Sequence, residues 1–244
     1  MRTIKLVIGY NGERYEGWQS QRNSKTLQEL FEKTLSRILK EKTDLISASR
    51  TDSGVHALGQ TAHFKTKNPL PVARIKSALN FYLPKDVVVF SAKEMPANFH
   101  ARYQARSKVY HYDIWNSPTR PLFEAPFTLW HPGKLDAASM NRATRHLKGK
   151  HDFNAFKAID GETKSSVREI KRISVKKIKT LIRIEIKGDG FLKHMVRIIA
   201  GTLIEVGRKK LKPQAIQQIL SSKDRTKAGP TAKPQGLTLL KITY

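Results

Sequence analysis

The 244-residue chain contains no cysteine. It therefore cannot form a disulfide, use a thiolate nucleophile or build the Cys-x-x-Cys zinc sites of nucleobase deaminases. Two phosphate-binding patterns are also missing, because no Gly-x-Gly-x-x-Gly opens a helix and no Gly-x-x-x-x-Gly-Lys-Ser/Thr loop occurs. Nothing points to a dinucleotide, a nucleoside triphosphate or a metal site. We expect any enzyme built on this chain to work without a cofactor.

Long apolar runs are scarce as well. The most apolar stretch, Met195 to Val206, is interrupted by Arg197 and Glu205 and is too short to cross a bilayer. The first ten residues alternate like a strand and lack the apolar run and the cleavage site of a signal peptide. We expect a soluble, cytoplasmic protein with no membrane partner.

Acidic residues are outnumbered: 46 lysines and arginines face 20 aspartates and glutamates, which gives a net charge of +26. Nucleic acid, an anionic membrane surface or an acidic protein would balance that charge, and the sequence shows no membrane element. Basic clusters at 171–172, 176–179 and 208–212 could each be a solvated face. With the whole chain so basic, they favour phosphate contacts, whose affinity falls steeply with salt.

Hydrophobic periodicity predicts a mixture of helices and strands. In the first half we expect strands at 4–10 and 87–90, helices at 26–40 and 72–82, and a broken strand region at 45–66. In the second half we expect a strand at 108–115, long strands within 170–186 and a final strand at 237–242. Helices are expected at 136–147, 191–206 and 213–220. Thr26 and Glu29 form a candidate capping box for the first helix.

Two split βαββαβ units, as in ferredoxin-like and RRM domains, are the economical interpretation. The join falls near 101–106, so we expect an N-terminal half at 1–104 and a C-terminal half at 105–244. Neither half carries a low-complexity linker. The predicted fold class is α+β, with both halves forming one continuous, mainly antiparallel sheet flanked by helices.

Arg50 and Asp52 are the first candidate for chemistry. They are two residues apart, so in an extended segment both side chains leave the same face, and the guanidinium would favour the ionised carboxylate. Gly54 permits a sharp turn directly afterwards. A positioned carboxylate is a potential nucleophile or general base, although most such pairs are surface ion pairs.

The residues around this pair decide between those two interpretations. Residues 50–64, Arg-Thr-Asp-Ser-Gly-Val-His-Ala-Leu-Gly-Gln-Thr-Ala-His-Phe, closely resemble the signature of the tRNA pseudouridine synthase A family. Further resemblances follow in order along essentially the whole chain: GWQSQ at 17–21, FHAR at 99–102, SKVYHY at 107–112, HDFNAF at 151–156, GFLKHMVR at 190–197, AGPTA at 228–232 and GLTL at 236–239.

The resemblance implies isomerisation of uridine to pseudouridine at positions 38, 39 and 40 in the anticodon stem-loop of tRNA. In that reaction the bond from N1 to the ribose breaks, the uracil turns, and C5 joins the same ribose carbon. The target base must first leave its stack, because a stacked nucleotide presents no face to a carboxylate. The resemblance also implies a homodimer that binds one tRNA across both subunits.

The resemblance makes Asp52 the essential carboxylate, which attacks the ribose or the base or abstracts a ribose proton; the sequence leaves these routes open. Tyr110 matches the active-site tyrosine, whose ring can stack on the uracil and whose hydroxyl could take the proton from C5. Tyr112 leaves the same face of the strand, and pattern alone does not choose between the two tyrosines.

Arg197 matches the basic residue that the family places beside the carboxylate. On its own helix it shares a polar stripe with His194, Gly201 and Glu205, which a solvent-facing side would explain equally well. An ion pair between Arg197 and Asp52 would leave Arg50, with His56, to contact phosphates or displaced nucleotides. Leu237 corresponds to the apolar residue that lines the uracil pocket.

Two other classes of function remain open. A non-catalytic RNA-binding protein with RRM-like sheets would explain the charge and the fold. It would leave Asp52 unexplained, because an acidic residue in an RNA cleft weakens binding. A metal-dependent nuclease would need several acidic ligands, and Asp52 has no acidic partner nearby in the sequence.

Overall fold

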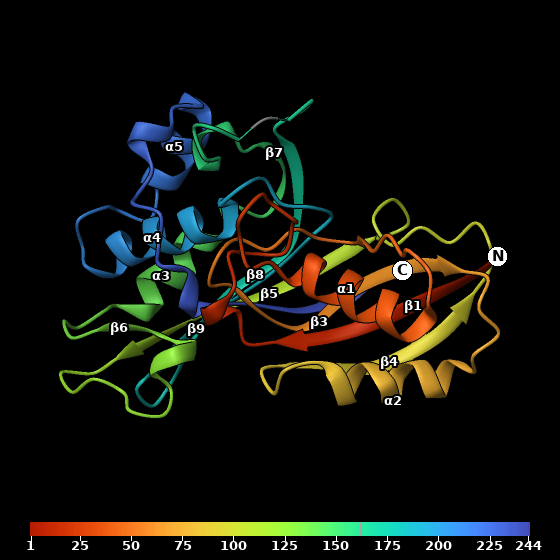
Figure 1. The fold of residues 1–244 in the computed structure, drawn as a ribbon. Helices are drawn as coiled ribbons and strands as arrows, with labels where there is room; N and C mark the ends of the chain where they lie inside the picture. The colour runs from red at the N-terminus through yellow and green to blue at the C-terminus, as the bar shows by residue number, and fades with distance from the viewer. Residues whose placement is uncertain (162) are drawn as a thin grey trace. The chain divides into compact units, whose positions relative to one another are not determined.

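The computed structural model describes residues 1–161 and 163–244 (Figure 1). The chain divides into two compact units, one made of Met1–Arg106 with Leu239–Tyr244 and the other of Ser107–Thr238. The expected division at 104 and 105 assigned the final strand to the second half, whereas most of that strand belongs to the first unit. Each unit is described by itself.

The first unit follows the order βαββαβ. Its elements are β1 (Arg2–Tyr10), α1 (Leu27–Leu39), β2 (Ile46–Ser47), β3 (His56–Thr66), α2 (Val72–Tyr82) and β4 (Val87–Met95). The strands lie in the order β4, β1, β3 and β10 (Leu237–Thr243), and β2 pairs with β3. The pairs β1–β3, β1–β4 and β2–β3 are antiparallel.

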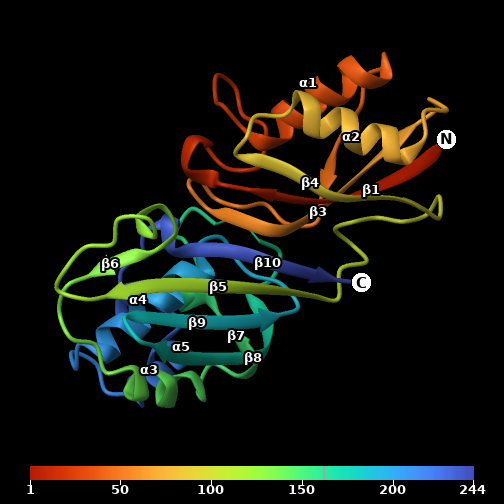
Figure 2. The same ribbon diagram turned by 90° about the horizontal axis from the view of Figure 1, so that it is seen from below.

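Alternation along β1 explains how this sheet is covered. Ile4, Leu6 and Ile8 are fully buried at every second position, as a strand with one apolar face requires. Both helices lie on the same face of the sheet (Figure 2). Helix α1 buries Leu27 and Phe31 among the residues that it spaces three and four apart, so it packs along one apolar stripe.

The predicted capping box at the start of α1 is wrong. Thr26 occupies the cap position, but its side chain makes no capping hydrogen bond. Instead, the amides of Leu27 and Gln28 donate to the carbonyls of Gly17 and Trp18, at 3.2 and 2.9 Å. Because these backbone carbonyls already satisfy the first helical amides, the threonine hydroxyl is not needed for that purpose.

The second unit contains two short strands that periodicity did not predict. Its elements are β5 (Ser107–Asn116), β6 (Leu129–His131), α3 (Ala137–Thr144), β7 (Gly149–Asp152), β8 (Val167–Ile178), β9 (Leu181–Gly188), α4 (Met195–Gly207) and α5 (Ala215–Ser222). The strands lie in the order β5, β9, β8 and β7, and β6 runs parallel to β5. Strands as short as β6 and β7 do not display a period of two.

Helix α4 begins later than its apolar pattern predicts. The pattern starts at Phe191, but His194 adopts a left-handed conformation with a φ of 60°, and the helix begins at Met195. In the sheet, Ile182, Ile184 and Ile186 of β9 are buried, as their alternation predicts. Helix α4 packs against β5, and α3 packs against α4 and β8.

Five single turns of 3-10 helix also occur in the described chain, at Gly12–Arg14, Ala125–Phe127, Asn154–Phe156, Arg225–Lys227 and Pro234–Gly236. Within the described part of the chain, every helix falls short of the length and apolar character needed to span a bilayer. The predicted α+β class, with mainly antiparallel strands flanked by helices, is confirmed.

Candidate active site

Asp52 lies in the first unit, in the segment that joins β2 to β3. As the break in the strand region and Gly54 predicted, Asp52 precedes a turn at Ser53 and Gly54, where Gly54 has a φ of 74°. The amide of Val55 donates to the Asp52 carbonyl at 3.2 Å and closes this turn. Asp52 is partly exposed, whereas Thr51 and Val55 on either side are buried. Buried neighbours therefore anchor a carboxylate that solvent or a ligand can reach.

The Gly-Trp-Gln stretch holds the residue before Asp52. The amide of Trp18 donates to the Thr51 carbonyl at 3.0 Å, and the Tyr10 hydroxyl shares a 2.8 Å hydrogen bond with Thr51 Oγ1. Gly17 has a φ of 95°, and a Cβ atom there would lie 2.7 Å from the Thr51 carbonyl oxygen. Trp18 is buried and stacks on Phe31 of α1. This motif therefore supports the Asp52 segment.

Two further contacts hold the segment on its other sides. The Gly54 amide donates to the Tyr15 carbonyl at 3.2 Å. At the other end, Gln60 Nε2 donates to the Ser49 carbonyl at 2.6 Å. Backbone held at so many points fixes the position from which the Asp52 side chain extends, as a preorganised site requires.

Arg50 and His56 flank Asp52 but occupy different environments. Arg50 is exposed, so it can reach a ligand at the surface. His56 is only 2% exposed, and its Nδ1 accepts a 3.0 Å hydrogen bond from the Gly12 amide. In the neutral ring the proton is therefore on Nε2. This burial favours a supporting role for His56, where its ring fixes the start of β3 against Gly12.

The second unit contains Tyr110 and Tyr112, and the structure distinguishes them. Both lie on β5, paired with Ile186 and Ile184 of β9. Tyr112 is fully buried, and its hydroxyl donates to the Lys233 carbonyl at 2.8 Å. Burial raises the pKa of Tyr112, and the nearby positive charge of Arg197 offsets part of that shift. Its hydroxyl is thus committed to holding the 228–236 segment.

Tyr110 has a different environment. Its ring is 6% exposed and packs edge-on against Phe191, with 5.3 Å between ring centroids. Phe191 belongs to the stretch that leads into α4, so the same stretch that positions Arg197 also braces Tyr110.

Arg197 lies in the first turn of α4 and is bound to Ala232 twice. Its Nε donates to the Ala232 carbonyl at 2.8 Å, and its own carbonyl accepts from the Ala232 amide at 3.1 Å. One turn later, a Cβ atom at Gly201 would lie 1.8 Å from the carbonyl oxygen of Pro230. The polar stripe on α4 therefore faces residues 228–232 rather than solvent along this part of the helix.

Leu237 follows directly on that segment. It is buried and begins β10, after a turn at Pro234–Gly236. A Cβ atom at Gly236 would lie 2.8 Å from the Tyr112 ring, so only glycine permits this approach. Sequence reasoning did not identify Gly201 and Gly236 as points of close approach. Their only signal was glycine inside a helical pattern and glycine before a strand.

No group of three or more histidine, aspartate or glutamate side chains within residues 1–161 and 163–244 is placed to hold a metal ion. The donors and acceptors described above are carboxylate, phenol, guanidinium and backbone groups. Such groups can position a ribose and a base, and they can move a proton.

Comparison with known proteins adds an independent observation. A sequence model of the family described as tRNA pseudouridine synthase matches residues 6–104 and 143–244. The chain is 46% identical over 246 residues to the tRNA pseudouridine synthase A of Acetivibrio thermocellus, and the match covers 100% of both chains. It is 47% identical over 245 residues to that of Ruminiclostridium cellulolyticum, also with full coverage of both. The chain belongs to the tRNA pseudouridine synthase family.

Proposed function

We propose that the protein isomerises uridine to pseudouridine at positions 38, 39 and 40 in the anticodon stem-loop of tRNAs, without a cofactor. Membership of the family and a net charge of +26 support a tRNA substrate. The observation that carries the proposal is the support of the Asp52 segment. Hydrogen bonds to Trp18, Tyr15 and Gln60 hold it on both sides of a partly exposed carboxylate.

The chemistry requires a carboxylate of this kind. The glycosidic bond from N1 of uracil breaks, the base turns, and a bond forms from C5 to the same ribose carbon, after which C5 loses its proton and N1 takes one up. Asp52 acts as the nucleophile on ribose or base, or as the base that removes a ribose proton. All three routes start from an ionised carboxylate, and all three need its side chain to stay in place while the uracil turns.

Tyr110 is proposed to stack on the displaced uracil and to accept the proton from C5 late in the reaction. The resemblance of residues 107–112 to the family's motif supports the choice of Tyr110 rather than Tyr112. Arg197 is proposed to favour the ionised form of the catalytic carboxylate. Its guanidinium has a defined orientation because Nε is bound to the Ala232 carbonyl.

The remaining expectations concern binding and assembly. Arg50, which is exposed, is proposed to contact phosphates or displaced nucleotides, and Leu237 to line the uracil pocket. His56 is proposed to support this surface from within. A homodimer and a cytoplasmic location stay predictions. Sedimentation velocity of the purified chain tests the first, and fractionation of the source cells tests the second.

Tritium release tests the proposal directly. An anticodon stem-loop with uridine labelled at C5 should release its label to water with the wild-type chain. With Asp52→Asn, release should fall by roughly 10³-fold or more, because a neutral amide replaces the reacting group. Asp44→Asn, at an exposed aspartate eight positions earlier, is the matched control and should keep full activity.

Each alternative function has its own outcome. Equal tRNA binding by the wild type and Asp52→Asn, with no release by either, would favour a non-catalytic RNA-binding protein. Loss of wild-type activity in EDTA would favour metal-dependent chemistry. Full activity of Asp52→Asn would show that another residue carries the reaction.

A further inference from the structure

An exposed aromatic ring in the first unit has no role in the proposed reaction. Tyr103, which follows the Phe-His-Ala-Arg motif at 99–102, is 78% exposed. Its ring has a defined position, because it stacks on the ring of His100 with 4.2 Å between centroids and 27° between planes. One face of the Tyr103 ring therefore contacts His100, and so high an exposure requires that solvent reaches the other face.

The ring of His100 is itself held in place. Its Nδ1 accepts hydrogen bonds from the amides of Arg102 and Tyr103 at 3.2 and 3.3 Å, so the proton of the neutral ring is on Nε2. The His100 ring also lies 5.0 Å from the ring of His63, which belongs to β3 and is 2% exposed. Three rings thus form a series from the sheet to the surface, in the order His63, His100 and Tyr103.

The backbone beside Tyr103 is fixed to the sheet at both polar groups of one residue. The Ala101 amide donates to His63 Nδ1 at 3.2 Å. The Ala101 carbonyl accepts from the hydroxyl of Tyr244, which follows β10, at 2.9 Å. Backbone and stacking partner together set the position of the Tyr103 ring before a ligand binds, and this lowers the entropic cost of binding.

Charge indicates the class of ligand. From 95 to 106 the chain has no acidic residue and carries Arg102 and Arg106. The Arg102 guanidinium lies 5.9 Å from the centre of the Tyr103 ring, near the outer limit of a cation–π contact. An aromatic face beside permanent cations suits an unpaired nucleic-acid base, because every base has a π face and is attached to phosphate. A protein partner would need an acidic surface to match the same charges.

We propose that the Tyr103 ring stacks on an unpaired base of the tRNA other than the reacting uridine. The inference rests on the proposed function, because it takes tRNA as the partner. Strand β3 begins at His56, shortly after Asp52, and His63 lies seven positions farther along, which corresponds to roughly 20 Å of strand. A ring mounted on His63 and His100 is therefore too far from the Asp52 segment to contact the same nucleotide.

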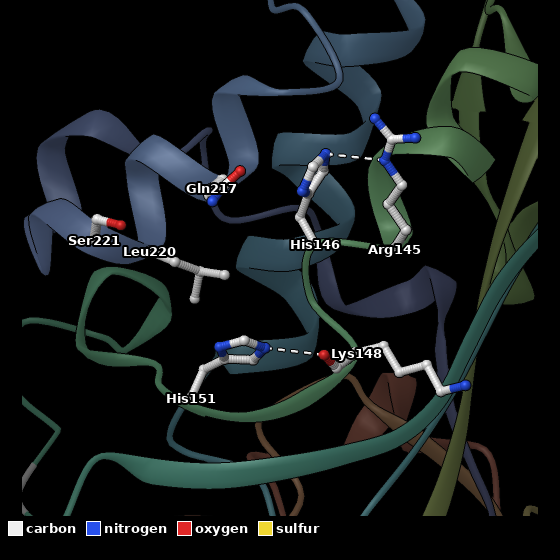
Figure 3. A pocket seen from close by; sticks show the side chains of 7 residues that line it. All are labelled: Arg145, His146, Lys148, His151, Gln217, Leu220 and Ser221. Atoms are coloured by element: carbon white, nitrogen blue, oxygen red, sulfur yellow. Dashed lines mark hydrogen bonds between the residues drawn. The ribbon is translucent and has the colours of Figure 1, made fainter.

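The cavity in the second unit presents different groups. It has a volume of about 310 Å³ and lies between the end of α3, strand β7 and helix α5 (Figure 3). The ends of the Arg145 and Lys148 side chains point away from it, and His151 Nε2 donates to the Lys148 carbonyl at 2.9 Å. Neither of these cations faces the cavity, so it lacks the charge that favours an RNA ligand beside Tyr103.

Binding of full-length tRNA tests the inference. Tyr103→Leu should weaken binding roughly tenfold, because an apolar side chain is kept but the stacking face is lost. Tyr103→Phe keeps that face and should bind within about twofold of the wild type. The matched control is Phe81→Leu, at a ring of the same unit that is 81% exposed, and it should leave the affinity unchanged.

Two further properties separate stacking from charge and from folding. The slope of log Kd against log salt should be equal for the wild type and Tyr103→Leu, because the lost ring carries no charge. Thermal unfolding should give the same Tm for both, because the ring lies outside the core. Wild-type affinity in Tyr103→Leu would overturn the inference. So would an equal loss of affinity in Phe81→Leu, or a tenfold loss in Tyr103→Phe.

A protein partner and a failure of the proposed function give different results. If Tyr103→Leu changed the sedimentation coefficient of the chain but not its tRNA affinity, the ring would contact a second copy and the inference would be overturned. With enzyme in excess and all tRNA bound, tritium release by Tyr103→Leu should be as fast as by the wild type. Slower release would place the ring at the reacting nucleotide and overturn the inference. No release by the wild type would refute the proposed function, whereas release with unaltered affinity in Tyr103→Leu would refute only the Tyr103 site.

Discussion

Replacing Gly201 by alanine should destabilise the second unit and impair the reaction, although alanine is the better helix former. In an exposed helix interior this exchange stabilises by about 1 kcal/mol. At position 201, however, the added Cβ would lie 1.8 Å from the carbonyl oxygen of Pro230. A carbon and an oxygen in contact need about 3.3 Å, so the two backbones must separate by roughly 1.5 Å.

That displacement acts on the segment that orients Arg197. The Ala232 amide donates to the Arg197 carbonyl at 3.1 Å, and the Gly229 amide donates to Thr202 Oγ1 at 2.9 Å. Weakening these hydrogen bonds costs about 1 kcal/mol each, and overpacking costs about 1–3 kcal/mol. After the helix-propensity gain of about 1 kcal/mol is subtracted, we expect a net loss of about 2–4 kcal/mol.

Thermal unfolding and single-turnover kinetics measure the two consequences. For a chain of 244 residues, a loss of about 2–4 kcal/mol lowers Tm by about 4–16 °C. Because a shift of about 1 Å in a positioned group can reduce a rate by about 100-fold, kcat should fall by up to that factor if Arg197 acts as proposed.

Gly207→Ala, at the last position of α4, is the matched control. The atoms nearest to its added Cβ belong to the side chains of Met140 and Leu135, at 2.8 to 3.3 Å, and a methionine side chain can move aside. This variant should lose less than about 1 kcal/mol and keep its kcat. If Gly201→Ala matched the wild type in both Tm and kcat, the packing of α4 against residues 228–232 could not be what positions Arg197.

Two further predictions follow. Tyr112→Phe should lose about 1 kcal/mol of stability with the hydrogen bond to Lys233 but keep tritium release, whereas Tyr110→Phe should lose tritium release; the reverse pattern of activities would exchange their roles. The pKa of His63 is lowered to about 4, mainly because the ring is buried and to a smaller extent because His100 is nearby. The unfolded chain, with a histidine pKa near 6.5, therefore binds the proton first, and the free energy of unfolding should fall by up to about 3 kcal/mol as the pH drops from about 6.5 to 4. Denaturant titrations of the wild type and His63→Gln across this window check the second prediction, and equal pH slopes for both would contradict it.

Periodicity was sufficient for the class of fold, and composition for the expectation of a polyanionic partner. Alternation at Ile182, Ile184 and Ile186 depends only on residues close together in the chain, so a strand with one buried face is readable without a structure. The excess of lysine and arginine is likewise independent of fold. The series of motifs identified the family, which the comparisons confirm.

The ends of two helices could not be predicted from the sequence, because they depend on the backbone conformation and contacts of the folded chain. The first amides of α1 are capped by the carbonyls of Gly17 and Trp18 rather than by Thr26. Helix α4 starts after its apolar pattern begins, because His194 turns into a left-handed conformation. A local pattern records propensity, but capping and helix ends depend on which backbone groups the folded chain brings together.

The candidate site divides in the same way. From the sequence alone we predicted Asp52 as the carboxylate and, by resemblance to the family, Tyr110 as the tyrosine, although pattern alone did not separate it from Tyr112. Only the tertiary structure committed the Tyr112 hydroxyl to the Lys233 carbonyl, 121 positions along the chain, and bound Arg197 to Ala232, 35 positions away. Residue type and spacing specify what chemistry a side chain can perform, whereas the contacts that engage or orient it arise only when distant segments pack against one another.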